Sequence, residues 1–242
     1  MGYAAHNRVH TTRTMTIKLL AIETSTDACS AALLCDGRVH DRYQLAPRAH
    51  GHLILDMVDA VLAEAGWSLK QLDGLAFGRG PGAFTGVRIA TGVIQGLAFG
   101  ADLPVVPVST LAALAQGAQR QHGATKVLAA LDARMTEIYW GVYQCNAAGL
   151  MIEAEAECVC PASHIEPPAG TGWFGIGSGF AAYAAILHTR LGILTGCAPD
   201  AYPQARDVAV LGAAAFAQGL AVSAEQALPV YLRDNVVQQR AV

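Results

Sequence analysis

The segment from Gly78 to Gly100 holds the first residues whose types and spacing could do chemistry. It reads GRGPGAFTGVRIATGVIQGLAFG, a glycine-rich loop leading into a helix, and such loops often hold phosphate on backbone N–H groups. A P-loop also needs Lys followed by Ser or Thr, and the dinucleotide fingerprint needs a glycine where this chain has Ala83. Pro81 removes one backbone donor. Phosphate binding is therefore disfavoured here, although the start of the helix could still attract an anion.

The helix after this loop carries Gly92, Gly96 and Gly100, spaced four apart and so aligned along one face. Inside a helix, each glycine costs about 1 kcal/mol relative to alanine. A row of glycines is useful where another helix backbone must approach closely, as in paired membrane helices. The approaching helix could belong to the chain's own core or to a partner subunit, and we favour the partner.

A second polar group, Glu23, Thr24 and Ser25, follows an apolar segment that begins at Ile17. In ATPases of the actin and sugar-kinase type, a turn in this place handles metal and phosphate with Asp, hydroxyl and Gly residues. Here Glu is present instead of Asp and the glycine is missing, so we interpret the turn as a degenerate nucleotide site. The GIGSG segment around Gly177 could be a remnant of the adenosine site, or simply a tight turn between strand and helix.

The other candidates for metal or nucleophile chemistry form no motif. His50 and His52 are two apart, so a helix would point them in different directions, and an HxxxH pair would need histidine at Ile54. The six cysteines include one close pair, Cys158 and Cys160, without zinc-type spacing, and we interpret them as reduced thiols. No GxSxG motif of a serine hydrolase occurs. We expect no metal ion, no cofactor and no catalytic residue.

The composition narrows the function classes. The 242 residues are 53% hydrophobic and only 14% charged, which is enough for a core and favours a surface covered by a stable protein partner. The formal net charge of −3 gives no general attraction to nucleic acid. We expect no signal peptide, and the apolar run near residues 208–222 is too short to span a bilayer. We expect a cytoplasmic protein that serves RNA, if at all, only indirectly.

The elements that position these residues follow from periodicity. A buried strand over residues 17–25 precedes two strands joined at Asp36 and Gly37, a strong hairpin signal. Residues 52–65 have the helical spacing of apolar side chains and end at Gly66. From residue 126 the strand–turn–strand pattern begins again, which predicts two related α/β lobes.

The second half is expected to contain an irregular stretch over residues 146–170, a strand that leads into a helix ending at Leu191, and a last helix capped by Asp207. We expect residues 1–14 to be a disordered extension, residues 15–110 to form the first, partner-docking lobe and residues 111–205 the second. Residues 206–242 are expected to pack back on the body as a helix and a tail.

Several segments, taken in order, resemble one family, the bacterial TsaB (YeaZ) proteins, over residues 15–237. They are LLAIETSTDACSAAL, the helix after RAHGH, GRGPGAFTGVRIATGVIQGLA, PVVPVSTLAALAQGA, VLAALDARMTEIYWGVY and PVYLRDN. The family supplies an accessory subunit for making threonylcarbamoyladenosine in tRNA. The chain departs from its pattern at Glu23, where Asp is common, and at Ala83, where Ser is common, and both departures argue further against phosphate chemistry.

The resemblance implies a two-lobed α/β fold of the actin, sugar-kinase and heat-shock ATPase type, with mixed sheets flanked by helices and built by internal duplication. It also implies a non-catalytic scaffold that binds and activates the paralogue TsaD, supports the ATPase TsaE through the complex and meets tRNA only indirectly. The same docking surface would pair two copies as a homodimer when TsaD is absent.

Carried onto this sequence, the docking surface is expected to comprise Leu53, Ile54, Met57, Val61, Arg88, Gly92, Gly96 and Gly100. Two other functions stay open: an ATP-dependent kinase-like enzyme of the same fold, and a metallopeptidase-like hydrolase.

Overall fold

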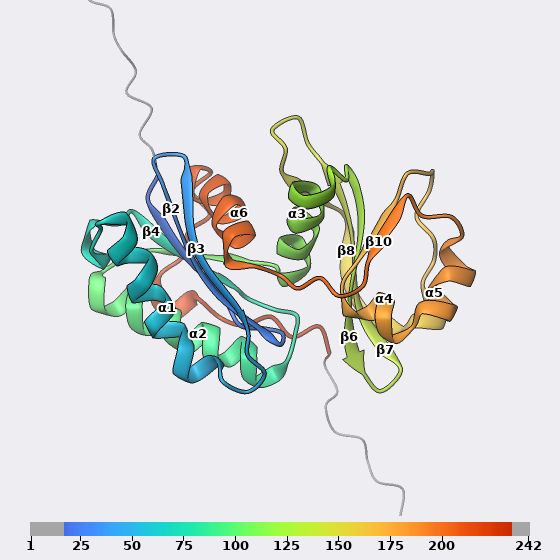
Figure 1. The fold of residues 1–242 in the computed structure, drawn as a ribbon, viewed down its shortest axis with the longest axis horizontal. Coiled ribbons are helices and arrows are strands. Elements are labelled where there is room, and N and C mark those ends of the chain that lie inside the picture. The colour runs from blue at the N-terminus through green and yellow to red at the C-terminus, as the bar shows by residue number, and fades with distance from the viewer. Residues whose placement is uncertain (1–16, 234–242) are drawn as a thin grey trace, which may run out of the picture.

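A computed structural model shows the chain as two lobes lying side by side (Figure 1). The structure describes residues 17–233, so the extension expected over residues 1–14 lies outside the described residues. Each lobe is built on a five-stranded sheet that mixes parallel and antiparallel pairs, with helices against its faces. This arrangement confirms the predicted fold class.

The sheet of the first lobe (lobe I) has the order β3-β2-β1-β4-β5. Its strands are β1 (Leu19–Glu23), β2 (Ala28–Cys35), β3 (Arg38–Leu45), β4 (Gly74–Gly78) and β5 (Val105–Val108). The first three form an antiparallel meander, whereas β4 and β5 run parallel to β1. Asp36 and Gly37 both have positive φ and close the predicted hairpin between β2 and β3.

The sheet of the second lobe (lobe II) repeats this plan. Its order is β8-β7-β6-β9-β10, again with an antiparallel meander followed by two parallel strands. The strands are β6 (Lys126–Arg134), β7 (Glu137–Cys145), β8 (Met151–Pro161), β9 (Phe174–Ile176) and β10 (Gly196–Ala198). Identical connections in both sheets confirm the internal duplication expected from the repeated pattern.

The helices form an outer layer on each lobe and one shared inner layer. On lobe I, α1 (His50–Ala65) and α2 (Phe84–Ala101) pack on one face of the sheet, and a 3-10 turn (Leu69–Gln71) lies between α1 and β4. On lobe II, the outer layer is much shorter and consists of a 3-10 turn (Ala162–His164), α4 (Ser178–Ala182) and α5 (Ala184–Leu191). Among residues 17–233, no helix is both long and apolar enough to cross a membrane.

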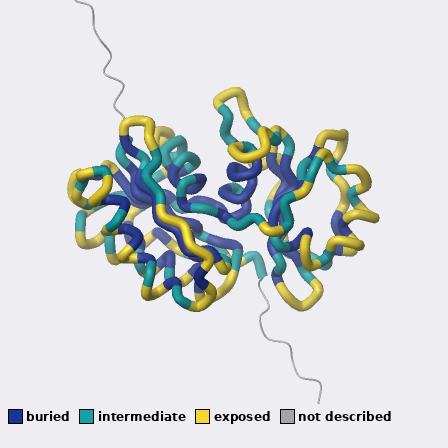
Figure 2. Tube along the Cα trace, in the orientation of Figure 1, coloured by how far each residue is buried: buried dark blue, intermediate teal, exposed yellow. Residues whose placement is uncertain are grey.

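The inner layer consists of α3 (Thr110–His122) and α6 (Ala205–Ala217), which pack against each other between the two sheets (Figure 1). The last helix of each repeat covers the sheet of the other repeat, since α3 contacts β6 to β9 and α6 contacts β1, β2, β4 and β5. Buried positions concentrate in the central strands of both sheets and in these inner helices, whereas the edge strands β3 and β8, the outer helices and the loops carry many exposed positions (Figure 2).

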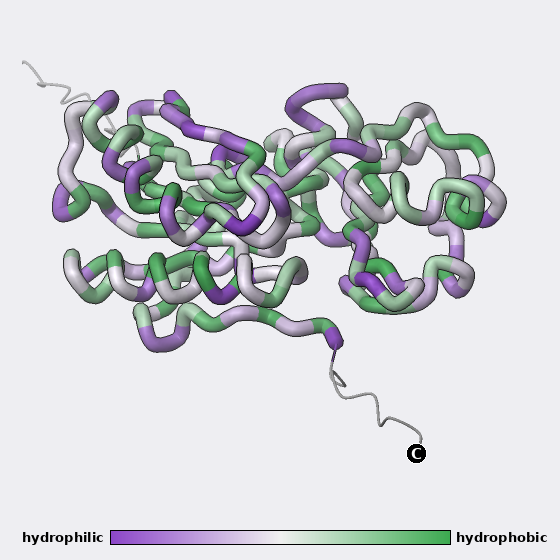
Figure 3. Tube along the Cα trace, turned by 60° about the horizontal axis from the view of Figure 1, so that its bottom comes forward, coloured by the Kyte–Doolittle hydropathy of each residue, from purple (hydrophilic) through white to green (hydrophobic). Residues whose placement is uncertain are grey.

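After α6 the chain returns along lobe I as a strap over residues 221–233, which includes a 3-10 turn (Ala224–Gln226). Val222 forms a bridge to Val105 at the edge of the lobe I sheet, and the 3-10 turn packs against α2. Figure 3 shows the strap beside the outer helix of lobe I. We call this segment the C-terminal strap.

Three expectations about the second half were wrong. Residues 146–170 contain the eleven-residue strand β8, whose glutamates at every second position were a strand signal. The helix ending at Leu191 is interrupted at Tyr183. Asp207 does not cap α6, since Gln204 holds that position and Asp207 lies in the first turn, paired with Arg120.

Candidate functional site

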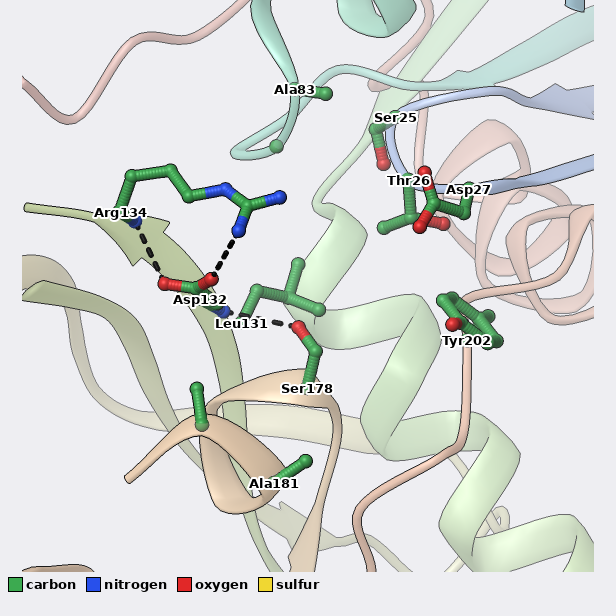
Figure 4. A pocket seen from close by; sticks show the side chains of 12 residues that line it. Ser25, Thr26, Asp27, Ala83, Leu131, Asp132, Arg134, Ser178, Ala181 and Tyr202 are labelled. Atoms are coloured by element: carbon green, nitrogen blue, oxygen red, sulfur yellow. Dashed lines mark hydrogen bonds and ion pairs between the residues drawn. The ribbon is translucent and has the colours of Figure 1, made fainter. Parts of the chain in front are cut away.

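Two regions of the molecule can be tested for function: the cleft between the lobes and the outer face of lobe I. The cleft holds a cavity of about 610 Å³. Ser25, Thr26 and Asp27 line it from the β1–β2 turn, while Asp132 and Arg134 line it from the end of β6 (Figure 4). Both hairpins of the duplicated fold therefore border one cleft, the region in which the sequence predicts a degenerate nucleotide site.

Of the expected degenerate nucleotide site, Ser25 lines the cavity, whereas Glu23, Thr24 and Gly177 are buried beside it. The Glu23 carboxylate accepts a hydrogen bond of 2.6 Å from the Ser25 backbone N–H, and Thr24 donates one of 2.7 Å to the Gly86 carbonyl. These contacts turn both side chains inward, because helices cover both faces of β1. Neither side chain is presented to the cavity, which accords with the interpretation of the turn as a degenerate nucleotide site.

Gly177 is the residue before α4 and packs on the carbonyl of Ala130, where a Cβ atom would lie only 2.4 Å from the oxygen. Its positive φ of 102° suits glycine as well. Both observations favour the second interpretation of the GIGSG segment, a tight turn between strand and helix.

Burial raises the pKa of the Glu23 carboxyl above its ordinary value, and the hydrogen bonds from Ser25 and Thr110 only partly oppose this. A Cβ atom at Gly78 would lie 1.8 Å from the Glu23 carboxylate, so glycine is required at the end of β4. The carboxyl is thus enclosed by the two strands and by the start of α3. It lies in the interior of lobe I and is not presented to the cleft.

The charges that do line the cleft suit a phosphate poorly. Arg134 forms an ion pair of 3.1 Å with Asp132, and Asp27 adds a second carboxylate to the wall (Figure 4). Tyr183 and the Arg134 backbone N–H also donate to Asp132. A polyphosphate would meet two carboxylates and a guanidinium that is already paired. Within residues 17–233, no cluster of three or more His, Cys, Asp or Glu side chains could hold a metal ion.

The outer face of lobe I offers different chemistry. At Gly92, Gly96 and Gly100, a Cβ atom would have no described atom within 4 Å, and all three residues are exposed. Beside them, Phe99 leaves 61% of its surface open. Close packing inside the chain's own core, the alternative left open by the sequence, is therefore excluded for the described residues. The glycines form a smooth, open stripe along α2.

The apolar residues expected to dock a partner on α1 instead hold this helix on its own sheet. Ile54 and Val61 are 0% exposed and Met57 is 9% exposed, so a partner of the folded chain cannot reach them. Leu53 is half-buried against the same core. The predicted helical spacing of these residues is confirmed, but it marks the face toward the sheet. The outward face of α1 presents Leu55, Asp56 and Asp59.

Arg88, also expected at the interface, lies at the N-terminal part of the stripe and is exposed. Its guanidinium carbon lies 3.5 Å from the centre of the Phe84 ring, and its Nε donates a 3.0 Å hydrogen bond to the Tyr231 hydroxyl. The two rings lie 5.8 Å apart and are both exposed. Sequence reasoning missed Phe84 and Phe99 of α2 and Tyr231 of the tail. Tyr231 could not be placed, because spacing along the chain does not bring the tail to α2.

The C-terminal strap joins this stack to lobe II. Gln95 of α2 donates to the Ala227 carbonyl at 3.1 Å, and the Val230 N–H donates to the Arg79 carbonyl at 2.8 Å. At its end, Arg233 donates to the Ala133 carbonyl and to the Glu137 carboxylate of the β6–β7 hairpin. The strap thereby connects the exposed helix α2 to the wall of the cleft.

Comparisons with known proteins agree with this fold. The family model of TsaD, tRNA N6-adenosine threonylcarbamoyltransferase, matches residues 39–241. The tRNA threonylcarbamoyladenosine biosynthesis protein TsaB of Escherichia coli is 44% identical over 91% of this chain and 96% of its own length. TsaB of Haemophilus influenzae is 42% identical over 91% and 95%.

A solved structure agrees equally well. YeaZ from Pseudomonas aeruginosa is 48% identical and superimposes with a TM-score of 0.85, covering 89% of this chain and 100% of that one. Likeness over nearly the whole length, in sequence and in structure, extends across both lobes and the inner helices. The chain therefore belongs to the TsaB (YeaZ) family of tRNA threonylcarbamoyladenosine biosynthesis proteins.

Proposed function

We propose that this chain is a non-catalytic subunit that binds and activates the threonylcarbamoyltransferase TsaD through the outer face of lobe I. The docking face consists of Leu55, Arg88, Gly92, Gly96, Phe99 and Gly100. The observation that carries the proposal is the glycine stripe on α2, where no described atom lies within 4 Å of any added Cβ. Three helix-weakening residues that the chain's own packing does not need point to an approaching helix from outside.

TsaD is the proposed partner because the TsaD family model matches this chain over residues 39–241. Chains of one fold carry counterpart helices, and two such faces can pack about an approximate two-fold axis. The same geometry lets two copies of this chain pair as a homodimer when TsaD is absent. A glycine stripe brings the facing helix backbones close, and Phe99 at its edge supplies the large apolar contact typical of interface centres.

The charges of the docking face suggest what the partner must offer. Arg88 is held between Phe84 and Tyr231, so its guanidinium is fixed in place and can pair with a carboxylate. Asp56 and Asp59 on the outward face of α1 would favour basic side chains opposite them. Charge complementarity of this kind fixes how α1 and α2 align with the partner's helices, and it adds less to the affinity.

The absence of catalysis is proposed from the cleft. Glu23, the acidic residue of the turn after β1, is buried away from the cavity, and the guanidinium of Arg134 in the cavity wall is paired with Asp132. Binding to one state of TsaD stabilises that state, which is how a non-catalytic subunit raises the activity of its partner. TsaE would join through the complex, and tRNA would be met through TsaD, as the net charge of −3 suggests. These reactions belong to the cytoplasm.

Calorimetric titration of the purified chain with TsaD tests the docking face. Gly96→Leu adds a side chain where the described residues leave open space, so the monomer should keep its fold and melting temperature. Because the facing backbone could no longer approach, the affinity for TsaD should fall by about 100-fold or more, about 2.7 kcal/mol. Ala185→Leu, at an exposed position of α5 on lobe II, is the matched control and should bind normally.

Unchanged affinity of the Gly96→Leu chain would refute the docking face. Activity is tested separately, by measuring tRNA threonylcarbamoylation by TsaD with and without this chain. If the wild-type chain binds TsaD but leaves this activity unchanged, the proposed docking is supported and the proposed activation is refuted.

One observation favours a second function, an ATP-dependent kinase of the same fold. The cleft cavity of about 610 Å³ has room for a nucleotide, and both hairpins border it. Titrating ATP and Mg²⁺ into the isolated chain separates the two functions. Tight, stoichiometric binding would favour the kinase, whereas we expect little heat and no saturation.

A further inference from the structure

The two closely spaced cysteines of β8 have no part in the proposed docking or in the cleft. Cys158 and Cys160 are two residues apart in a strand, so both side chains leave the same face. Their sulfur atoms lie 3.9 Å apart. Cys158 is exposed, whereas Cys160 is half-buried against the core of lobe II. One sulfur is therefore open to reagents in solution, and a second, half-buried sulfur lies beside it on the same face of the strand.

The strand that carries them is able to deform. β8 is the edge strand of the lobe II sheet, and among the described strands it pairs with β7 alone. The pairing between β7 and β8 already shifts register between Trp140 and Val142, next to Cys158. An edge strand with an irregular register can pucker without breaking a second ladder.

The two sulfurs also differ chemically. Burial raises the pKa of the Cys160 thiol to about 12, and the neighbouring Cys158 adds to this effect. Cys160 therefore stays largely protonated at neutral pH, and only its small deprotonated fraction can act as a nucleophile. An exposed thiol beside a shielded one is the arrangement of an attacking cysteine and a resolving cysteine.

We propose that Cys158 and Cys160 form a thiol–disulfide exchange site for small disulfides of the glutathione type. The Cys158 thiolate attacks one sulfur of the small disulfide, forms a mixed disulfide and releases one small thiolate. Cys160 then gives its proton to water and attacks the Cys158 sulfur, which releases the second small thiolate. In sum, two protein thiols are oxidised to one disulfide and the small disulfide is reduced to two thiols.

Closing the bond requires the sulfurs to approach by about 2 Å, since a disulfide spans about 2.05 Å. The pucker this needs in β8 makes the bond reducible, because strained and exposed disulfides are the labile ones. Glu157 precedes Cys158 and accepts hydrogen bonds from Tyr143 and from Ser109, the residue that caps α3. A shift of β8 on oxidation would therefore displace Glu157 and change its hydrogen bond from Ser109 at the start of α3.

Peptide mapping of the full chain tests the exchange. The chain is incubated with excess oxidised glutathione, its free thiols are alkylated, and it is cleaved after Glu157 and Arg190. The released fragment, residues 158–190, contains Cys158 and Cys160 and no other cysteine. We expect this fragment to lack two hydrogens and to carry neither glutathione nor the alkylating group.

Variants separate the two steps. Cys160→Ser should stop at the first step and keep glutathione on Cys158, whereas Cys158→Ser should react far more slowly. In the wild-type chain, the mixed disulfide should resolve faster as pH rises from 7 to 9, by up to about tenfold per pH unit, because more Cys160 is deprotonated. Cys197, exposed on β10, reports general thiol reactivity.

A wild-type fragment with both thiols alkylated would overturn the proposal, because exchange would not have occurred. A wild-type fragment that keeps glutathione on Cys158, as in Cys160→Ser, would also overturn it, because Cys160 would not be a resolving cysteine. Modification of Cys197 with no reaction at Cys158 would be a third contrary result.

Discussion

The inner and outer helices of this protein use small residues for opposite purposes. In the inner layer, a Cβ atom at Gly212 of α6 would lie 2.8 Å from the Cβ of Ala76, and one at Gly117 of α3 would lie 3.3 Å from the Asp207 carboxylate. In the outer layer, the glycines of α2 have no described atom within 4 Å. Contacts inside the chain explain the first set, whereas we attribute the second to a contact outside it.

Charged residues of the inner and outer helices also differ in whether the chain itself pairs and buries them. Arg120 of α3 and Asp207 of α6 form a two-pronged ion pair, with both N–O distances at 2.8 Å, and Asp207 is only 2% exposed. Asp56, Asp59 and Arg88 of the outer layer are exposed instead. The inner layer is an interface between the two duplicated lobes, and its charged residues Arg120 and Asp207 are paired within the chain. The outer layer of lobe I resembles one half of such an interface.

Lobe II shows that long outer helices are not a necessary consequence of the duplicated fold. Its sheet repeats that of lobe I, yet a three-residue 3-10 turn and two short helices, α4 and α5, form its outer layer. Long outer helices are thus a property of one copy. We infer that the two copies diverged after duplication, with lobe I specialised for docking.

The largest effect on stability should come from breaking the inner ion pair. Asp207→Ala leaves Arg120 without its partner beside α6, which should cost about 3 kcal/mol of unfolding free energy. Asp59→Ala, on the outward face of α1, is the control and should change stability by less than about 0.5 kcal/mol. Urea unfolding of the three proteins measures both values. Equal effects would erase the distinction between inner and outer charges.

The next effect should come from a methyl group added to the inner layer. Gly212→Ala places a Cβ atom against Ala76, at 2.8 Å, so the helix must move away from the sheet. Overpacking of this kind costs about 1–3 kcal/mol. Thermal unfolding followed by circular dichroism would show a lowered melting temperature. A melting temperature at or above that of the wild-type chain would mean that the inner helices are loosely packed.

Glu23 of β1, which lies between the outer and inner helices, should make the free energy of unfolding depend on pH. Its pKa is raised on folding, so the folded state binds a proton more tightly than the unfolded state. This stabilisation is complete below the unfolded pKa near 4.5 and is lost as pH rises through the folded pKa. A tenfold difference in proton affinity between the two states corresponds to about 1.4 kcal/mol of stability.

Glu23→Gln keeps the shape of the side chain and removes this titration. From pH 4.5 upward, the stability of the wild-type chain should therefore fall relative to that of the variant, as measured by urea unfolding at several pH values. A difference that stays constant with pH would mean that Glu23 titrates normally in the folded chain.

The smallest effect should have the opposite sign. Gly96→Ala adds a methyl group in open space on α2, so the monomer should gain up to about 1 kcal/mol from helix propensity. The same methyl group should weaken binding to TsaD, because the facing helix must move outward. Thermal unfolding and calorimetric titration measure the two changes. Gain of stability with unchanged binding would leave the glycine stripe without a function.

Much of lobe I could be predicted from the sequence, because its signals are local. The Asp36–Gly37 turn, the helical spacing that ends at Gly66 and the glycine stripe all depend on neighbouring residues, and the structure shows each element. The same spacing was misleading at Ile54 and Val61. An apolar stripe shows that one face of a helix is buried, but it does not show whether its own sheet or a partner covers it.

The candidate sites depended more on tertiary structure. Glu23 was assigned to a degenerate nucleotide site, and its burial could not be predicted from the sequence, because α1, α2 and α6 all pack against β1 and enclose it. β8 was missed although its alternating glutamates indicate a strand, because the nearby prolines suggested a loop. Tyr231 could not have been placed beside Arg88, since 143 residues separate them in the chain.

By itself, the sequence determined the family, the duplicated α/β plan and the glycine row, because motifs and periodicity are written in neighbouring residues. Only the tertiary structure decided that α3 and α6 cover each other's lobes, that Arg120 meets Asp207, and that the C-terminal strap fixes Arg88 through Tyr231. These contacts join residues far apart in the chain. Their formation depends on how whole layers pack, and local patterns carry no record of that packing.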